Sequence, residues 1–112
     1  MEGFYAAYMT GRTGQSVLLF AIKDGRLTGV DVGGMRYDGH VDPKPDGSGF
    51  SCRVSYTIRP GASLITRAGP VATPTDVSVT FDLPTNFGDG PIIGIQTPTG
   101  PLNAKFVKLR DF

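Results

Sequence analysis

The stretch from Gly25 to Val41 reads Gly-Arg-Leu-Thr-Gly-Val-Asp-Val-Gly-Gly-Met-Arg-Tyr-Asp-Gly-His-Val, and it decides the fold that the sequence predicts. Five of its seventeen residues are glycine, and side chains typical of strands stand between them. Glycine weakens a strand, so glycine inside one usually marks a bulge, a bend or a close approach of two backbones. Two consecutive strands interrupted in this way predict a sheet that curls on itself.

The pair Asp24-Gly25, where this stretch begins, is the clearest local signal in the chain. An Asp-Gly pair between two strand patterns favours a two-residue type I′ turn, because both central residues need positive φ. We therefore expect Gln15–Lys23 to pair antiparallel with Arg26–Val32.

Strict alternation of apolar and polar residues over Phe50–Arg59 predicts a strand with one buried and one solvated face. Further strands are expected at Phe4–Thr10, Met35–Asp42, Val77–Leu83, Ile92–Thr97 and Leu102–Leu109, with a short one at Ala62–Arg67. About eight strands joined by short loops, with no helical pattern, favour an all-β up-and-down antiparallel barrel of lipocalin-like shape. A two-sheet β-sandwich is the alternative fold.

Composition places the chain among compact single domains, here residues 1–112, rather than disordered or membrane proteins. It has 39% hydrophobic residues, a net charge of +1 and one cysteine. Interspersed charges of both signs argue against direct nucleic-acid or membrane binding. With neither a signal-peptide pattern nor a long apolar run, we expect a cytoplasmic protein.

The strand around Val17–Ile22 is apolar on both faces, which requires a cover on each side. An outer face of this kind predicts a subunit interface and hence a homodimer. The alternative is a terminus or loop that folds over it. The candidate dimer strand comprises Val17, Leu18, Leu19, Phe20 and Ile22.

The first half of the chain resembles the negative regulators of type III secretion, which antagonise a transcriptional activator. The resemblance covers residues 3–41 well and residues 50–58 loosely. Its motifs are Gly3-x-Tyr5, the turn Gly11–Gly14, Lys23-Asp24-Gly25, Gly29-Val30-Asp31, Tyr37-x-Gly39 and, in the last strand, Ala104-Lys105-Phe106.

That resemblance implies a small eight-stranded barrel, often dimeric, without catalysis. In the regulators, an acidic surface cluster after the Tyr-x-Gly strand contacts the activator. Here Asp42 and Asp46 stand at that position with Lys44 between them. The acidic contact is therefore not expected to carry over, and these three residues remain the candidate partner-binding loop.

Catalytic and metal chemistry find little support in the sequence. Asp38, His40 and Asp42 share one face of a strand, but a lone histidine cannot complete a closed metal site. Cys52 belongs to the apolar face of its strand and is expected to be an inert buried thiol. We expect no cofactor and no enzymatic activity.

Two functions follow for such a barrel. The first is a regulatory or protein-interaction module, with a transcriptional regulator as one candidate partner. The second is a lipocalin-like carrier of a small apolar ligand, with Val54, Tyr56 and Phe81 lining the interior. We expect bulky side chains to fill the interior, whereas space near Gly29, Gly33 or Gly94 would favour the carrier.

Overall fold

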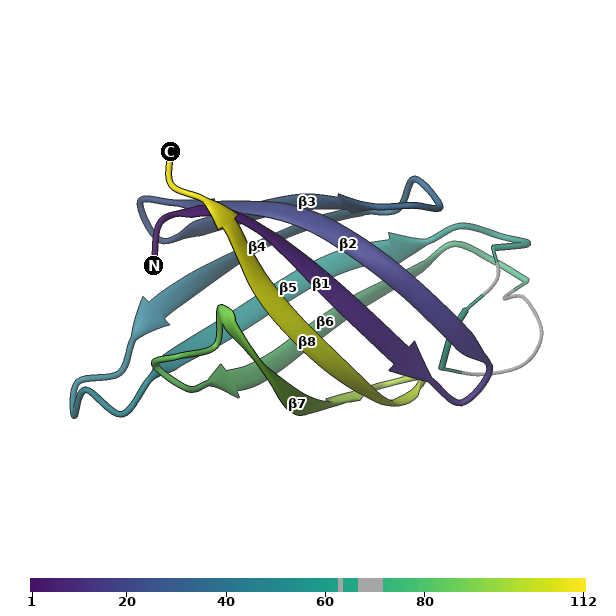
Figure 1. Cartoon of the computed structure of the whole chain (residues 1–112). Helices are drawn as coiled ribbons and strands as arrows, with labels where there is room; N and C mark the ends of the chain where they lie inside the picture. The colour runs from purple at the N-terminus through teal and green to yellow at the C-terminus, as the bar shows by residue number, and fades with distance from the viewer. Residues whose placement is uncertain (63, 67–71) are drawn as a thin grey trace.

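The computed structural model describes residues 1–62, 64–66 and 72–112, and in these ranges it is an all-β protein (Figure 1). No helix in the described part of the chain has the length and apolarity to cross a membrane. The strands are β1 (Gly3–Gly11), β2 (Gly14–Lys23), β3 (Arg26–Asp31), β4 (Arg36–Pro43), β5 (Phe50–Ile58), β6 (Thr75–Leu83), β7 (Asp89–Thr97) and β8 (Gly100–Arg110).

All eight strands belong to one antiparallel sheet in the order β6-β5-β4-β3-β2-β1-β8-β7. The sheet curls into a nearly closed barrel (Figure 1), with β6 and β7 as its two edges. Within the described residues no backbone ladder joins these edges. The single sheet confirms the up-and-down barrel and is incompatible with the two-sheet sandwich.

The turn at Asp24-Gly25 has the predicted geometry. Asp24 has φ of 52° and Gly25 has φ of 76°. Lys23 pairs with Arg26 directly across the turn, so β2 and β3 form a tight hairpin. The two residues supply the positive φ angles that a type I′ turn needs.

Two glycines of the opening stretch are required by close packing. A Cβ on Gly29 would lie 2.6 Å from the Cβ of Phe20 on β2, and a Cβ on Gly39 would collide with the carbonyl oxygen of Arg53. At both positions the adjacent strand approaches so closely that any side chain would force the two strands apart. This is the physical basis of the predicted bending.

Aromatic side chains fill one end of the barrel. Phe87, from the turn between β6 and β7, is 2% exposed and stacks on Tyr5 with ring centroids 5.2 Å apart. Phe50 and Phe106 each pack edge-on against the ring of Phe87. Phe20 stacks on Tyr5. These five rings form what we call the aromatic plug.

The short strand predicted at Ala62–Arg67 is wrong for the part that can be judged. Ala62 and Leu64–Thr66 are not in a strand, and Ser63 and Arg67 lie outside the described residues. Instead, Thr13 in the β1–β2 turn donates from its backbone N to Ile65 O (2.8 Å) and from Oγ1 to Leu64 O (2.8 Å). The carbonyl oxygens of Leu64 and Ile65 thus accept hydrogen bonds from Thr13 in a turn rather than from a neighbouring strand.

Candidate ligand-binding cavity

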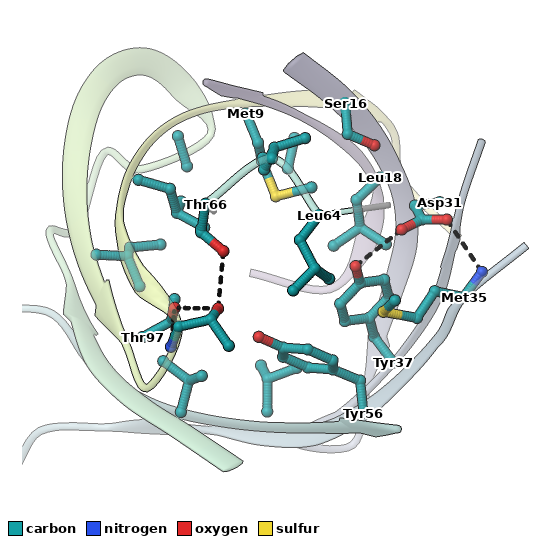
Figure 2. Close-up of a pocket in the computed structure, with 18 of the residues that line it drawn as sticks. Met9, Ser16, Leu18, Asp31, Met35, Tyr37, Tyr56, Leu64, Thr66 and Thr97 are labelled. Atoms are coloured by element: carbon teal, nitrogen blue, oxygen red, sulfur yellow. Dashed lines mark hydrogen bonds between the residues drawn. The ribbon is translucent and has the colours of Figure 1, made fainter. Parts of the chain in front are cut away.

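The barrel end opposite the aromatic plug is hollow. Its cavity has a volume of about 390 Å³. Phe20 and Phe106, which belong to the plug, line the cavity at the plug end, and we call them its floor. Leu64 and Thr66 line it as well (Figure 2). The expectation of an interior filled by side chains holds at the plug and is wrong at this end.

Small side chains on three adjacent strands explain the cavity. Ala7 on β1, Ser16 on β2 and Ala104 on β8 all line it. Each occupies an inward position where a larger residue would have reached the opposite wall. The glycines considered in the sequence contribute little: Gly33 lines the cavity, but Gly94 is exposed and the space at Gly29 is occupied by Phe20 and Leu18.

The predicted lining residues do line this cavity. Val54 and Tyr56 reach it from β5, and Phe81 reaches it from β6. Phe50 and Leu83, which share the same inward faces, instead pair with each other at the plug end. The lining is predominantly apolar, as small-molecule pockets usually are.

One polar group on the wall, the Asp31 carboxylate, is hydrogen-bonded within the protein through both of its oxygens. The Asp31 carboxylate accepts bonds from the backbone N of Gly33 (2.9 Å) and Met35 (3.0 Å) through Oδ1, and from the Tyr37 hydroxyl (2.9 Å) through Oδ2. Burial, followed by the neighbouring Asp31 charge, raises the pKa of Tyr37. Tyr37 therefore stays protonated and holds Asp31 at the β3–β4 turn.

Three threonine hydroxyls form a chain on another part of the wall. Thr66, 6% exposed, lies 2.7 Å from Thr99 between Oγ1 atoms, and Thr99 lies 3.2 Å from Thr97. Thr97 donates its only hydroxyl proton to Gly100 O at 2.6 Å. Thr66 ends the chain, with its oxygen directed into the interior (Figure 2).

Tyr56 places another hydroxyl on the cavity wall. Its ring lies beside Tyr37 with centroids 5.0 Å apart, but its hydroxyl has no hydrogen-bond partner among the described residues. Figure 2 shows this hydroxyl pointing into the cavity. Burial raises the pKa of Tyr56, so the hydroxyl is a neutral donor and acceptor at neutral pH.

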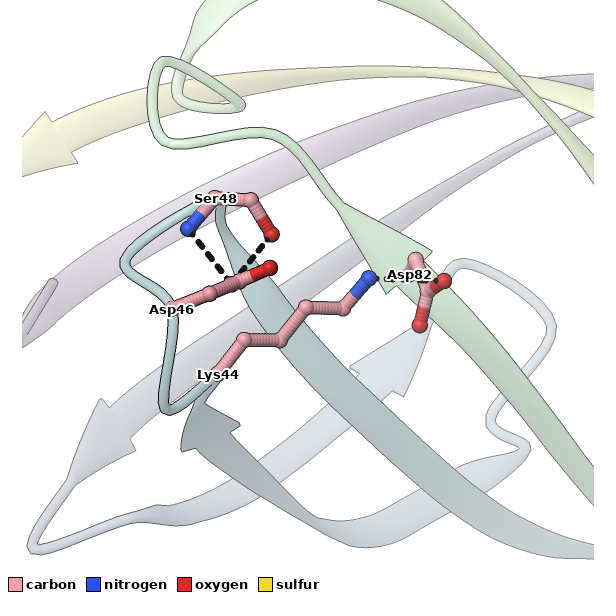
Figure 3. Close-up of polar contacts among 4 residues, drawn as sticks. All are labelled: Lys44, Asp46, Ser48 and Asp82. Atoms are coloured by element: carbon pink, nitrogen blue, oxygen red, sulfur yellow. Dashed lines mark hydrogen bonds and ion pairs between the residues drawn. The ribbon is translucent and has the colours of Figure 1, made fainter.

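The predicted partner-binding loop begins at Asp42 near the end of β4 and continues between β4 and β5 (Figure 3), and none of Asp42, Lys44 and Asp46 lines the cavity. Lys44 Nζ pairs with Asp82 Oδ2 on β6 at 2.9 Å. Asp46 Oδ1 accepts from Ser48 Oγ (2.7 Å) and Ser48 N (3.0 Å), and these bonds lower the pKa of Asp46. Two of the three loop charges thus have partners within the chain, and a role in binding another protein stays a prediction.

The side chains of the predicted dimer strand, β2, alternate between the inside and the outside of the barrel. Leu18, Phe20 and Ile22 are buried inside the barrel, while Val17 is half-buried and Leu19 is 52% exposed on the outside. Leu19 pairs with Ala6 on one side and Val30 on the other. We call the exposed or half-buried outward residues Tyr8, Val17, Leu19, Val30 and Val32 the outer apolar face.

Asp38, His40 and Asp42 are exposed on the outside of β4, on one face as predicted. No group of three or more His, Cys, Asp or Glu side chains in residues 1–62, 64–66 and 72–112 could hold a metal ion. Cys52 is buried inside the barrel, and its burial, with a smaller contribution from Asp42, raises its pKa to about 12. Cys52 and His40 therefore lie on opposite faces of the sheet.

The sequence reasoning missed the small residues and the threonines of the cavity. Counting inward positions along β1, β2 and β8 would have found Ala7, Ser16 and Ala104, because their neighbours alternate with period two. Thr66 could not have been found, since no sequence pattern places its loop beside the cavity.

Comparison of the chain with protein-family models, with curated proteins and with solved structures finds no match.

Proposed function

We propose that this barrel binds a small, largely apolar molecule in its interior, as a carrier or sensor, and does not catalyse a reaction. The observation that carries the proposal is the apolar cavity of about 390 Å³ above the aromatic plug. That volume lies within the range of roughly 300–1,000 Å³ typical of small-molecule sites. The plug supplies a rigid floor, so the cavity is built into the folded state rather than opened by a ligand.

The side chains around the cavity support binding rather than catalysis. The three hydrogen bonds that the Asp31 carboxylate accepts favour its charged form, so it is a weak base. Cys52 could pair with the imidazole of His40 only across the sheet, because adjacent positions on β4 and β5 place them on opposite faces. A nucleophile needs its base within hydrogen-bond reach.

Titration with the neutral fluorescent probe N-phenyl-1-naphthylamine tests the proposal, together with native mass spectrometry of freshly purified protein. We expect saturable probe binding that Val54→Trp or Phe81→Trp abolishes, because either indole would occupy the cavity. Thr80→Trp is the matched control, since Thr80 lies between Val79 and Phe81 but on the exposed face of β6. Wild-type protein that neither binds the probe nor carries a small-molecule adduct would remove the ligand-binding function.

A second candidate function is protein interaction through the outer apolar face. Tyr8 pairs with Val17, and Leu19 pairs with Val30, so the exposed apolar side chains are neighbours across three strands. Contiguous apolar surface of this kind marks interaction sites on soluble proteins. We propose a second copy of this chain as the partner, which retains the homodimer expected from β2.

The regulatory role implied by the resemblance to negative regulators of type III secretion belongs to this second candidate. Its loop Asp42–Ser48 would offer a partner one isolated carboxylate, Asp42, because Lys44 and Asp46 are engaged within the chain. Co-purification of the chain with an activator protein, lost in Asp42→Asn, would support that role. The proposed compartment is the cytoplasm, which fractionation of cells expressing the tagged chain tests.

A further inference from the structure

Apart from Asp31, the polar side chains of the described lining are uncharged. In the described part of the lining there is no lysine, arginine or histidine. Figure 2 shows the hydroxyls of Tyr56 and Thr66, which have unused hydrogen-bonding capacity, pointing inward, and Ser16 adds a third hydroxyl to the wall. A ligand headgroup would therefore meet neutral donors and acceptors rather than a charge.

An anionic headgroup has no partner in this cavity. A carboxylate buried without a cation costs several kcal/mol, and it usually takes up a proton or stays in water. Here the one charged lining group, Asp31, carries the same sign and would add repulsion. Fatty acids and other apolar carboxylates are accordingly disfavoured.

A cationic headgroup is also poorly served. Asp31 already accepts from two backbone N–H groups and the Tyr37 hydroxyl, which occupy three of its roughly four acceptor sites. An ammonium group would reach only the one acceptor site left on Asp31 Oδ2, and a closer approach would displace the Tyr37 hydroxyl. Losing such a bond leaves a buried donor unsatisfied.

A neutral oxygen fits what remains. The Tyr56 hydroxyl can donate to an alcohol or ketone oxygen, since it has no partner among the described residues. Because Thr97 gives its proton to Gly100 O, Thr99 donates to Thr97 and Thr66 donates to Thr99. Thr66 therefore has no proton left for a ligand but can accept a second bond. The apolar walls and the aromatic floor would then bury the rest of the molecule.

We propose that the cavity selects an uncharged amphipathic molecule, with an apolar body and one alcohol hydroxyl that accepts from Tyr56 and donates to Thr66. A ketone oxygen would bond to Tyr56 alone. This inference rests on the proposed ligand-binding function and adds the chemical class of the ligand. Orientation follows from it: the oxygen lies toward the Tyr56 and Thr66 side of the wall, and the apolar body lies toward Phe20 and Phe106.

The test compares ligands that share a tail and differ in headgroup. Displacement of N-phenyl-1-naphthylamine is measured with 1-decanol, 2-decanone, decanoate and decylamine at neutral pH. We expect the alcohol and the ketone to displace the probe at concentrations about tenfold or more below those of the two charged ligands. One unpaired buried charge accounts for a difference of that size.

Two conservative variants locate the headgroup. Tyr56→Phe and Thr66→Val should each lower the affinity for 1-decanol by about threefold to tenfold, because each removes one hydrogen bond to its hydroxyl. The affinity for the probe should stay unchanged. Ser55→Ala is the control, since Ser55 is the exposed neighbour of Tyr56 on β5. Unchanged probe affinity shows that the cavity of each variant is intact.

The outcomes separate the two proposals. Equal displacement by neutral and charged ligands, or tighter binding of decanoate or decylamine, would overturn the ligand class while the ligand-binding function stands. Undiminished 1-decanol affinity in both Tyr56→Phe and Thr66→Val would overturn the headgroup site at these two hydroxyls, while the ligand-binding function stands. Absence of both probe binding and a small-molecule adduct in the wild-type chain would instead overturn the proposed function itself.

Discussion

Phe87 stacks on Tyr5 across 5.2 Å between ring centroids, so a residue from a turn closes one end of the barrel. Phe87→Ala should lower the free energy of unfolding by about 3–5 kcal/mol, because it leaves a cavity within the aromatic plug. Urea denaturation measures the change. Phe112→Ala is the control, since Phe112 is half-exposed, and a cost below about 1 kcal/mol for Phe87→Ala would contradict the plug.

Gly39→Ala should destabilise the fold, whereas Gly94→Ala should be tolerated. A methyl group on Gly39 meets the backbone of Arg53, but on Gly94 the nearest atom is Asn103 Oδ1 at 3.8 Å. Forcing atoms into a filled space costs about 1–3 kcal/mol, and a substitution into open space changes stability by about 0.5 kcal/mol or less. Thermal melts of the two variants compare them, and equal midpoints would show that the β4–β5 approach is not tight.

Alkaline pH should destabilise the protein partly through Cys52. Its pKa is raised from 9.0 to about 12 in the folded state, so the folded chain keeps a proton that the unfolded chain loses. The resulting stability is complete below about pH 9 and is lost as pH rises toward 12, by about 1.4 kcal/mol per pH unit at most. Tyr37 and Tyr56, whose pKa values are also raised, act in the same direction.

Urea unfolding near pH 8 and pH 10.5 isolates the thiol. Wild-type protein should lose about 2 kcal/mol more than Cys52→Ala over this interval, which follows from the slope above. Identical losses for the two proteins would mean that the thiol is accessible to solvent in the folded state.

Leu19→Glu should convert the proposed homodimer into a monomer. A carboxylate at the centre of the outer apolar face would be desolvated without a partner in any assembly through that face. Sedimentation equilibrium at roughly micromolar concentration reads the mass, with Thr80→Glu on the exposed face of β6 as the control. A wild-type chain that sediments only as a monomer would remove the homodimer.

His40→Ala should change the free energy of unfolding by less than about 0.5 kcal/mol, as exposed substitutions usually do. His40 is exposed on β4 beside Asp38 and Asp42. Chemical denaturation measures the effect, and elemental analysis checks for metal. A transition metal bound at stoichiometric level by wild type and lost in His40→Ala would overturn the interpretation of this face as solvated surface.

Local chemistry made the strands predictable. Asp24 and Gly25 need only their own φ angles to form the turn, and the alternation over Phe50–Ile58 survives as inward and outward side chains. Both signals are contained within a few neighbouring residues. The fold class followed because short turns between such strands leave few topologies.

The cavity was not predictable to the same degree, because it depends on what faces what across the barrel. Bulky side chains at Tyr56 and Phe81 suggested a filled interior, but they lie in a cavity also lined by Ala7 and Ala104, from strands distant in sequence. Phe87 stood in a segment whose glycines and proline marked only a turn. The burial of Phe87 depends on the length of the turn and on its stacking against the ring of Tyr5.

The order of the strands also bears on how the chain folds. Every ladder but one joins strands that follow each other in sequence, and the exception pairs β1 with β8, where Phe4 lies opposite Arg110. That ladder closes a loop of almost the whole chain. Closing it costs conformational entropy before the β1–β8 contacts can stabilise the fold. A chain cut within the β6–β7 turn and joined between β8 and β1 would retain every ladder as a hairpin. Its contact order would fall sharply, so we expect the rearranged chain to fold faster than the natural one.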